Sequence, residues 1–182
     1  NRQLLQYMQK HFADKAEIEL VEIKDLPVFN KPADKQIPAE ATEIAAKIEA
    51  ADGVIIGTPE YDHSIPAVLM SALSYGVFPL LNKPIMITGA SYGTLGSSRA
   101  QLQLRQILNA PEIKANVLPD EFLLSHSLQA FDQNGDLVDL DVIKKLDAIF
   151  DDFRIFVKVT EKLRNAQELL RKDAEDFDWE NL

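Results

Sequence analysis

Two short apolar segments, each followed by a polar loop and then by a helix-like pattern, restrict the possible folds of this chain most strongly. The segments are VIIG at 54–57 and IMITGA at 85–90. Continuous apolar runs are typical of strands that are covered on both faces of a sheet. Because a helical pattern follows each loop, the order predicts an α/β fold with a mainly parallel sheet.

The other patterns of the chain fit the same class. Apolar residues at helical spacing predict helices over 2–12, 38–51, 66–73 and 99–110 and a long helix from Leu140. Strands are expected at 18–23 (IELVEI) and 114–118 (KANVL), and an excursion with a turn at Asn134-Gly135 at 121–139. We therefore expect one domain over 1–165, followed by a polar helical tail over 166–182.

The composition excludes several classes of function. The chain has 182 residues and a formal net charge of −10, which argues against nucleic acid or an anionic membrane as a partner. It has no cysteine, and its three histidines are too scattered for a metal site, so no metal is expected. No apolar run is long enough to span a bilayer, and a cytoplasmic protein is the default interpretation.

Two polar loops are the candidate sites. In open parallel sheets, ligands bind beyond the carboxyl ends of the strands. Residues 58–64 (TPEYDHS) follow the first apolar segment, and residues 91–98 (SYGTLGSS) follow the second. The small residues of the second loop would let backbone N–H groups approach a planar or anionic ligand closely. Taken alone, each loop is ordinary turn sequence, and the pairing of the two is the informative feature.

The stretch PEYDHSIPAVLMSAL resembles the P-E-Y-N-x-S-x-P-x-x-L-K-N-A-L signature of the NAD(P)H-dependent FMN reductases, which have a flavodoxin-like fold. ITGASYGTLGSSRAQLQLRQIL is similar to the second flavin loop of that family, and the similarity covers most of residues 1–150. The resemblance implies a three-layer α/β/α sandwich with a five-stranded parallel sheet. It also implies bound FMN, with NADPH or NADH as co-substrate and a flavin, quinone, azo compound or similar small molecule as acceptor.

The resemblance also implies which residues hold FMN. One group would lie against the isoalloxazine edge, largely through backbone atoms, namely Pro59, Glu60, Tyr61 and Asp62. A second group would hold the other side of the ring and the ribityl chain, namely Ser91, Tyr92, Gly93, Thr94 and Gly96. Asp62 stands where the family usually has Asn, so any contact through its side chain is in question.

The start of the sequence departs from the family pattern. The family opens with a strand and a phosphate loop resembling G-S-x-R-x-x-S-x-N, and Asn1 matches the last residue of that loop. We expect a further strand that lies in the sheet between the strands 18–23 and 54–57. Roughly a dozen or more residues that precede Asn1 in the sequence would supply it. The FMN phosphate would then lie near Asn1, at a helix N-terminus. A second departure is the short helix before Ser74-Tyr75.

No acid–base side chain is required for hydride transfer to a flavin, so we nominate no catalytic residue. Tyr61, Tyr92 and His63 could shape the acceptor pocket, whereas Arg99 could be a phosphate ligand or a surface charge. Glu60 could be solvated or could cross a subunit boundary. The apolar positions from Ile143 to Val157 suit the core or a dimer contact.

Two other functions compete with the reductase. A flavodoxin-like electron carrier would suit the acidic surface but would not turn over NAD(P)H. A flavin-free α/β binding or regulatory domain would not bind FMN. The reductase is favoured because the motif belongs to that family, and the family resemblance further suggests a homodimer or dimer of dimers. Phe177 and Trp179, in an acidic tail, could clamp a partner subunit.

Overall fold

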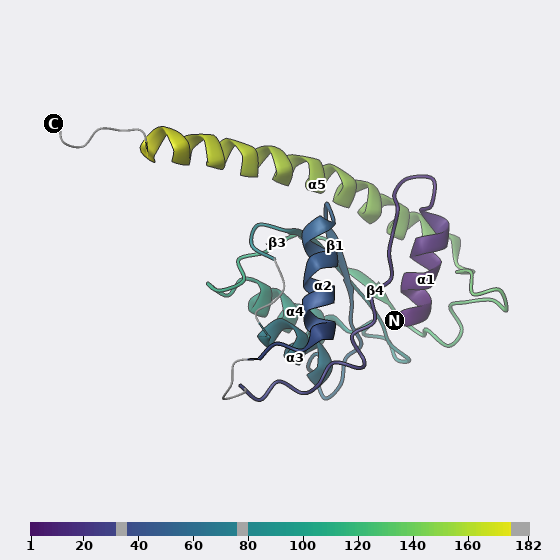
Figure 1. The fold of residues 1–182 in the computed structure, drawn as a ribbon. Helices are drawn as coiled ribbons and strands as arrows, with labels where there is room; N and C mark the ends of the chain where they lie inside the picture. Colours follow the sequence, from purple (N-terminus) through teal and green to yellow (C-terminus); the bar gives the residue numbers. More distant parts are fainter. Residues whose placement is uncertain (32–35, 76–79, 176–182) are drawn as a thin grey trace.

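A four-stranded parallel sheet forms the centre of the protein (Figure 1). The computed structural model describes residues 1–31, 36–75 and 80–175. Strand β2 (Pro84–Ala90) is the middle strand and is buried along its whole length. Strand β1 (Val54–Gly57) pairs with one side of β2. Strands β3 (Asn116–Val117) and β4 (Phe122–Leu124) pair with the other side, one after the other along β2. The expected parallel α/β class is confirmed, but the described residues form four strands and not the five that the family resemblance implied.

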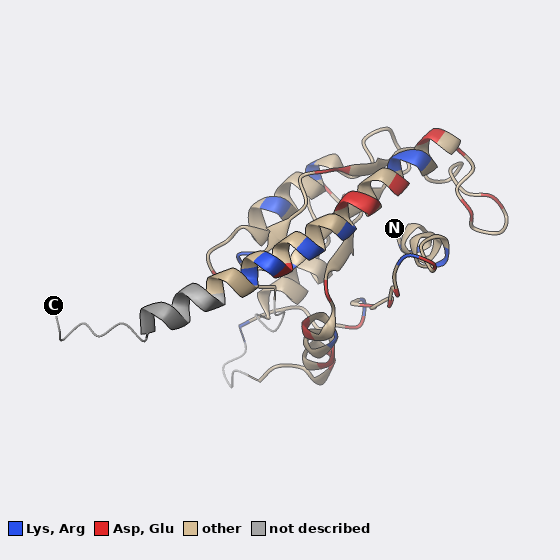
Figure 2. Ribbon diagram, turned by 90° about the horizontal axis from the view of Figure 1, so that it is seen from above, with Lys and Arg blue, Asp and Glu red and all other residues tan. Residues whose placement is uncertain are grey.

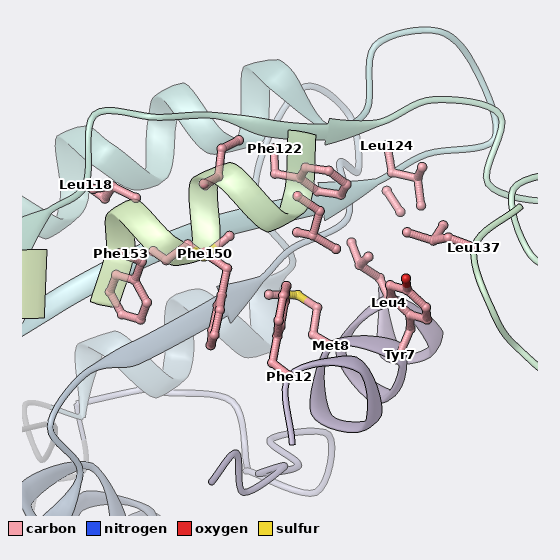
Figure 3. Packing of buried hydrophobic residues seen from close by; sticks show 14 residues of the cluster. Leu4, Tyr7, Met8, Phe12, Leu118, Phe122, Leu124, Leu137, Phe150 and Phe153 are labelled. Carbon is pink, nitrogen blue, oxygen red and sulfur yellow. The ribbon is translucent and has the colours of Figure 1, made fainter. Parts of the chain in front are cut away.

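Helices cover both faces of this sheet. Helices α1 (Arg2–His11) and α5 (Leu140–Glu175) lie on one face, where their apolar residues surround Met86 and Ala90 of β2 (Figure 3). Helices α3 (Ala67–Ser74) and α4 (Ser98–Leu108) lie on the other face, over Ile85 and Ile87. Because side chains alternate along a strand, β2 contributes residues to the apolar cluster on each face of the sheet. Helix α2 (Ala39–Ala50) packs against α3 through Ala41, Ile44 and Ala72.

The predicted helices all form, and their ends agree with the sequence to within one or two residues. The turn at Asn134-Gly135 also forms, with Gly135 at φ +81° and an antiparallel bridge between Phe131 and Leu137. The apolar positions of α5 at every third or fourth residue belong to the core, namely Ile143, Leu146, Phe150, Phe153 and Val157. The ring of Phe150 stacks there on that of Phe12, with 3.8 Å between centroids.

One predicted strand does not form, and one segment predicted as an excursion contains a strand. Residues 18–23 belong to no strand, although Ile18 and Ile23 do pack against the apolar clusters. A strand needs a neighbour for its N–H and C=O groups, and the alternating pattern reports only the buried face. Strand β1 is also partly exposed rather than covered throughout, because among the described residues no strand pairs with its other side. The predicted excursion at 121–139 begins instead with β4, which returns to the sheet beside β2.

The long helix α5 continues well beyond the body of the protein (Figure 1). Its residues up to Thr160 contribute buried side chains, whereas residues 161–167 are all exposed. The expected boundary between domain and tail at 165/166 lies within this one helix and stays a prediction. Phe177, Trp179 and the residues that follow Tyr75, up to Pro79, lie outside the described residues.

Candidate functional site

The two polar loops begin side by side at the carboxyl edge of the sheet. Gly57, the last residue of β1, is in register with Thr88 of β2, and the backbone N–H of Thr58 donates to the Thr88 carbonyl at 2.9 Å. Each loop then turns away from its strand to enter a helix. The expectation that the two loops are neighbours is therefore confirmed.

The first loop is a tight turn with two residues in the left-handed region. Tyr61 and Ser64 exchange backbone hydrogen bonds of 3.0 and 2.9 Å, and Asp62 and His63 between them have φ values of +49° and +65°. Positive φ at both central residues is the geometry of a type I′ turn, in which Asn is favoured and Asp is tolerated. The turn projects from the surface, and the Tyr61 side chain is 63% exposed.

Glu60 links the first loop to the helix that follows the second. Its Oε2 accepts hydrogen bonds from the backbone N–H groups of Arg99 and Ala100 at 2.9 and 3.3 Å, so it caps the N-terminus of α4 from another segment of the chain. Its Oε1 accepts a 2.6 Å bond from Arg99 Nε. The carboxylate thereby satisfies both the helix end and the guanidinium.

The charge state of Glu60 follows from these contacts. Only 9% of its side chain is exposed, and burial alone would raise its pKa. The bonds from the Arg99 guanidinium and from the two backbone N–H groups outweigh burial and hold the pKa of Glu60 below its usual value. Arg99 also approaches His63, with Nη1 2.7 Å from Nε2. Since an arginine can only donate, Nε2 is the acceptor in this contact.

A second contact fixes the other end of the same loop to α4. The Gln103 Oε1 atom accepts hydrogen bonds from Ser64 Oγ at 2.7 Å and from the Ile65 backbone N–H at 3.0 Å. Glu60 and Gln103 together attach both ends of the first loop to α4. Because α4 begins where the second loop ends, one helix sets the relative position of both loops.

The second loop is held from its far side by the segment after β4. The carbonyls of Ser91 and Gly93 accept backbone bonds from Ser127 and His126, each at 2.9 Å. The Thr94 carbonyl accepts from Ser125 Oγ at 2.6 Å. These bonds occupy three carbonyls of the loop and fix its backbone.

The contacts of the Ser91 hydroxyl and the lack of space at Gly96 explain why the second loop contains serine and glycine. Ser91 Oγ accepts from the Gly96 N–H at 2.9 Å and donates to the Gly93 carbonyl at 3.1 Å. Gly96 has φ +56° and lies against Leu123, where a Cβ would come within 2.6 Å of backbone. Both residues therefore shape the loop, and Gly96 is buried.

Three backbone donors of this loop remain available. Within the described part of the chain, the N–H groups of Tyr92, Gly93 and Thr94 donate to no protein acceptor. All three residues are exposed, and a Cβ at Gly93 would meet nothing within 4 Å. Tyr92 is 75% exposed, so an aromatic side chain stands at each loop. Successive free N–H groups beside open space suit an anionic or carbonyl-bearing ligand.

The N-terminus of α1 reaches the same edge of the sheet. The Asn1 side chain makes two hydrogen bonds with Ala90, the last residue of β2: its Nδ2 donates to the carbonyl at 3.1 Å and its Oδ1 accepts from the N–H at 2.9 Å. The positive end of the α1 dipole therefore lies beside the start of the second loop. This is the position that the sequence predicted for phosphate binding.

A buried polar layer lies beneath the loops. The Oγ1 atom of Thr88 and the Oε1 atom of Gln101 are buried and lack hydrogen-bond partners among the described residues. Gln101 Nε2 donates to the Phe122 carbonyl at 3.0 Å and so links α4 to β4. A Cβ at Gly89 would collide with Ser97 and with the Thr58 carbonyl, so only glycine fits there.

Other kinds of site find no support in this part of the chain. Among the residues that the structure describes, no group of three or more His, Cys, Asp or Glu side chains could hold a metal ion. None of the described helices is both long and apolar enough to cross a membrane. Two hollows elsewhere, one next to Lys83 and one next to Ile155, do not include residues of either loop.

Comparison with known proteins gives the family. Residues 1–129 match the family model described as NADPH-dependent FMN reductase. The chain therefore belongs to the NADPH-dependent FMN reductase family, as the sequence motifs indicated. The solved structure of FerB, a flavoenzyme NAD(P)H:(acceptor) oxidoreductase from Paracoccus denitrificans, has a TM-score of 0.70 and 25% sequence identity, covering 88% of this chain and 89% of that chain.

Two curated relatives are more similar in sequence. The NADH:(hydroxy)cinnamate reductase subunit CrdA of Vibrio ruber is 50% identical over 99% of this chain and 91% of its own length. The NADH-dependent flavin reductase subunit 2 of Lactobacillus johnsonii is 45% identical over 89% of this chain and 92% of its own length. Both similarities cover nearly the whole chain, including much of α5.

The structure brings the sequence-predicted residues to one edge of the sheet, but in different roles. Tyr61, Asp62, Tyr92, Gly93 and Thr94 are exposed there, whereas the side chains of Glu60 and Ser91 are occupied by contacts within the protein. Sequence reasoning missed the supports of the loops, which are Gln103 and residues 125–127. The SHS stretch directly after a strand was the available signal for the latter.

Proposed function

We propose that the two loops hold FMN and that the protein transfers hydride from NAD(P)H to FMN and on to a flavin, a quinone or a similar small acceptor. The observation that carries the proposal is the row of free backbone N–H groups at Tyr92, Gly93 and Thr94. It lies at the carboxyl edge of a parallel sheet, beside a second loop fixed to the same helix. Family membership supports the same cofactor.

The residues of the site fit an FMN molecule. The free N–H groups of the second loop would donate to the ring or its ribityl chain, and Tyr61 and Tyr92 would flank the ring. The first loop would present the backbone of Pro59 and Asp62 to the ring edge. Asn1, at the N-terminus of α1, would lie toward the phosphate, where backbone dipoles compensate its charge. Gly96, Ser91 and Glu60 would act by fixing the loops.

Bound FMN supplies the hydride chemistry, and the protein positions the reactants. The exposed surface over Tyr61 and Tyr92 leaves room for a planar nicotinamide or acceptor to stack on the ring. His63 lies at this edge of the sheet, beside Arg99, and could donate a proton through Nδ1 when its Nε2 accepts from the guanidinium. Two relatives with 50% and 45% identity are named for NADH, which favours NADH as the donor for this chain as well.

The assembly and location are also proposals. Both of these relatives are named as subunits, which supports an oligomeric enzyme. We propose a homodimer, as the family resemblance suggests, located in the cytoplasm, where NAD(P)H is available. The non-enzymatic carrier receives no support from the comparisons.

An absorbance spectrum and a turnover assay test this function. Protein expressed from its complete coding sequence should carry FMN or bind it with quenching of flavin fluorescence. It should oxidise NADH, NADPH or both when riboflavin or a benzoquinone is added. Absence of flavin binding would support the flavin-free domain instead. Flavin binding without NAD(P)H oxidation would support the electron carrier.

A further inference from the structure

One side of α5, from Ile155 into the protruding part of the helix, carries large apolar side chains in water. Ile155, Val159 and Leu163 are 61%, 57% and 53% exposed. They are spaced four residues apart and therefore lie along one side of the helix. Beyond Thr160 the helix has no buried side chain among residues 161–167, so this side is not covered by the body of the protein. A contiguous apolar side on an extended helix is typical of an interface.

A basic hollow adjoins this side. It has a volume of about 340 Å³ and is lined by Lys15, Asp151, Arg154, Ile155 and Lys158. Asp151 forms ion pairs with Lys15 at 2.9 Å and with Arg154 at 3.2 Å. Lys158 forms no ion pair within the described residues. Three cations thus face one carboxylate, on a chain whose net charge is −10. Figure 2 shows acidic and basic residues together in the first half of α5, and mostly Lys and Arg further along the helix.

The same chain contains a segment of complementary chemistry. Residues 176–182 have the sequence DFDWENL, with three carboxylates around Phe177 and Trp179. We propose that this segment of a second copy of the chain docks in the basic hollow, with its aromatic residues beside Ile155 and its carboxylates beside Arg154 and Lys158. The inference specifies the interface of the homodimer proposed above.

The segment cannot reach the hollow of its own chain. Ile155 and Glu175 lie in one continuous helix, 20 residues apart, which corresponds to about 30 Å. The four residues from Glu175 to Trp179 span at most about 14 Å when fully extended. Docking within one chain would therefore require α5 to unfold. A second copy avoids that cost.

A twofold arrangement satisfies both copies at once. If the two α5 helices run antiparallel, residues 176–182 of each chain can reach the hollow beside Ile155 of the other chain. Each copy then provides one segment and one hollow, as an isologous interface requires.

Trp179 provides a direct readout because it is the only tryptophan of the chain. Its emission should shift to shorter wavelength as the protein concentration is raised, together with the change from monomer to dimer in analytical ultracentrifugation. Deletion of 176–182 should remove the emission and weaken the dimer at least about tenfold. The double variant Phe177→Ala and Trp179→Phe should weaken it as well.

Charge variants test whether the basic hollow is the site at which the segment docks. Lys158→Glu should weaken the dimer and leave Trp179 emission at long wavelength. Lys145→Glu makes the same charge change on exposed α5 outside the proposed overlap, and it should leave both unchanged. Mixing the Lys158→Glu chain with a chain carrying Asp176→Lys and Asp178→Lys should restore a dimer of the two different chains.

The result can contradict the proposal in three ways. A chain that stays monomeric, a truncated chain that dimerises as tightly as the intact one, or Trp179 emission that is already short-wavelength in the monomer would each refute it. FMN binding and NADH oxidation are measured on the same samples. The interface and the proposed activity can therefore fail independently.

Discussion

Asp62 and His63 are the residues on which the shape of the first loop depends most directly. Both have positive φ, in the region that Asn, Asp and His enter more readily than other non-glycine residues. This explains why Asp can occupy a position where the family usually has Asn: the requirement is a backbone conformation. Neither the carboxylate nor an amide is needed for the turn itself.

Substitutions at residue 62 test this explanation. Asp62→Asn should change the free energy of unfolding little, whereas Asp62→Val should lower it by about 1–2 kcal/mol because a β-branched residue is strained at this φ. Urea unfolding measures both. Asp14→Val is the control, since Asp14 is exposed and is not among the residues with positive φ. Equal losses at both positions would contradict the backbone explanation.

The lowered pKa of Glu60 predicts that the stability of the protein depends on pH. Its pKa is lower in the folded protein than its usual value of 4.5, so the folded state binds fewer protons than the unfolded state. The stabilisation is therefore complete above about pH 4.5 and is lost as the pH falls through the lowered value. Glu60→Gln should reduce stability at pH 7, and its difference from the wild type should shrink at acid pH.

Measurement of unfolding at several pH values between 3 and 7 tests this prediction, with Glu40→Gln as the exposed control of identical chemistry. A difference between wild type and Glu60→Gln that is independent of pH would show that the carboxylate charge is not what caps α4.

At the scale of elements, α4 determines how the two loops face each other. Gln103→Ala removes the acceptor for Ser64 Oγ and the Ile65 N–H and should destabilise the protein by about 1–2 kcal/mol. FMN affinity should fall about threefold to tenfold as the first loop loosens. Flavin fluorescence titration measures this. Gln106→Ala, on the exposed side of the same helix, should leave FMN affinity unchanged.

The sequence predicted elements well where the information was local. Helical spacing and flanking prolines are sufficient for helices such as α2 and α3, and the family motifs located both loops. The strand predicted at 18–23 fails because pairing depends on a neighbour that periodicity does not reveal. β4 has only three residues, too few for a pattern. The support at Gln103 could not be predicted because it acts across 38 or 39 residues of chain, and the partner of Ser125 lies 31 residues away, so the SHS stretch indicates a polar site but not what it contacts.

At the scale of the whole molecule, the net charge of −10 acts on every charged substrate. In residues 58–64 and 91–99 the one cation among Lys and Arg is Arg99, which is paired with Glu60, and Asp62 adds another negative charge. Binding of an anionic nicotinamide nucleotide therefore occurs against a repulsive field, and NADPH has an additional phosphate compared with NADH.

Salt should therefore increase the efficiency of the enzyme. Raising the ionic strength from about 0.01 M to 0.15 M shortens the screening length from about 30 Å to 8 Å and weakens this repulsion. The kcat/KM value should rise for both nucleotides, and more for NADPH, whereas the KM of a neutral quinone should barely change. Steady-state assays at constant pH measure these values. A fall in kcat/KM with salt would instead require a basic surface at the site, supplied by residues other than those of the two loops, and an attractive rather than a repulsive approach of the nucleotide.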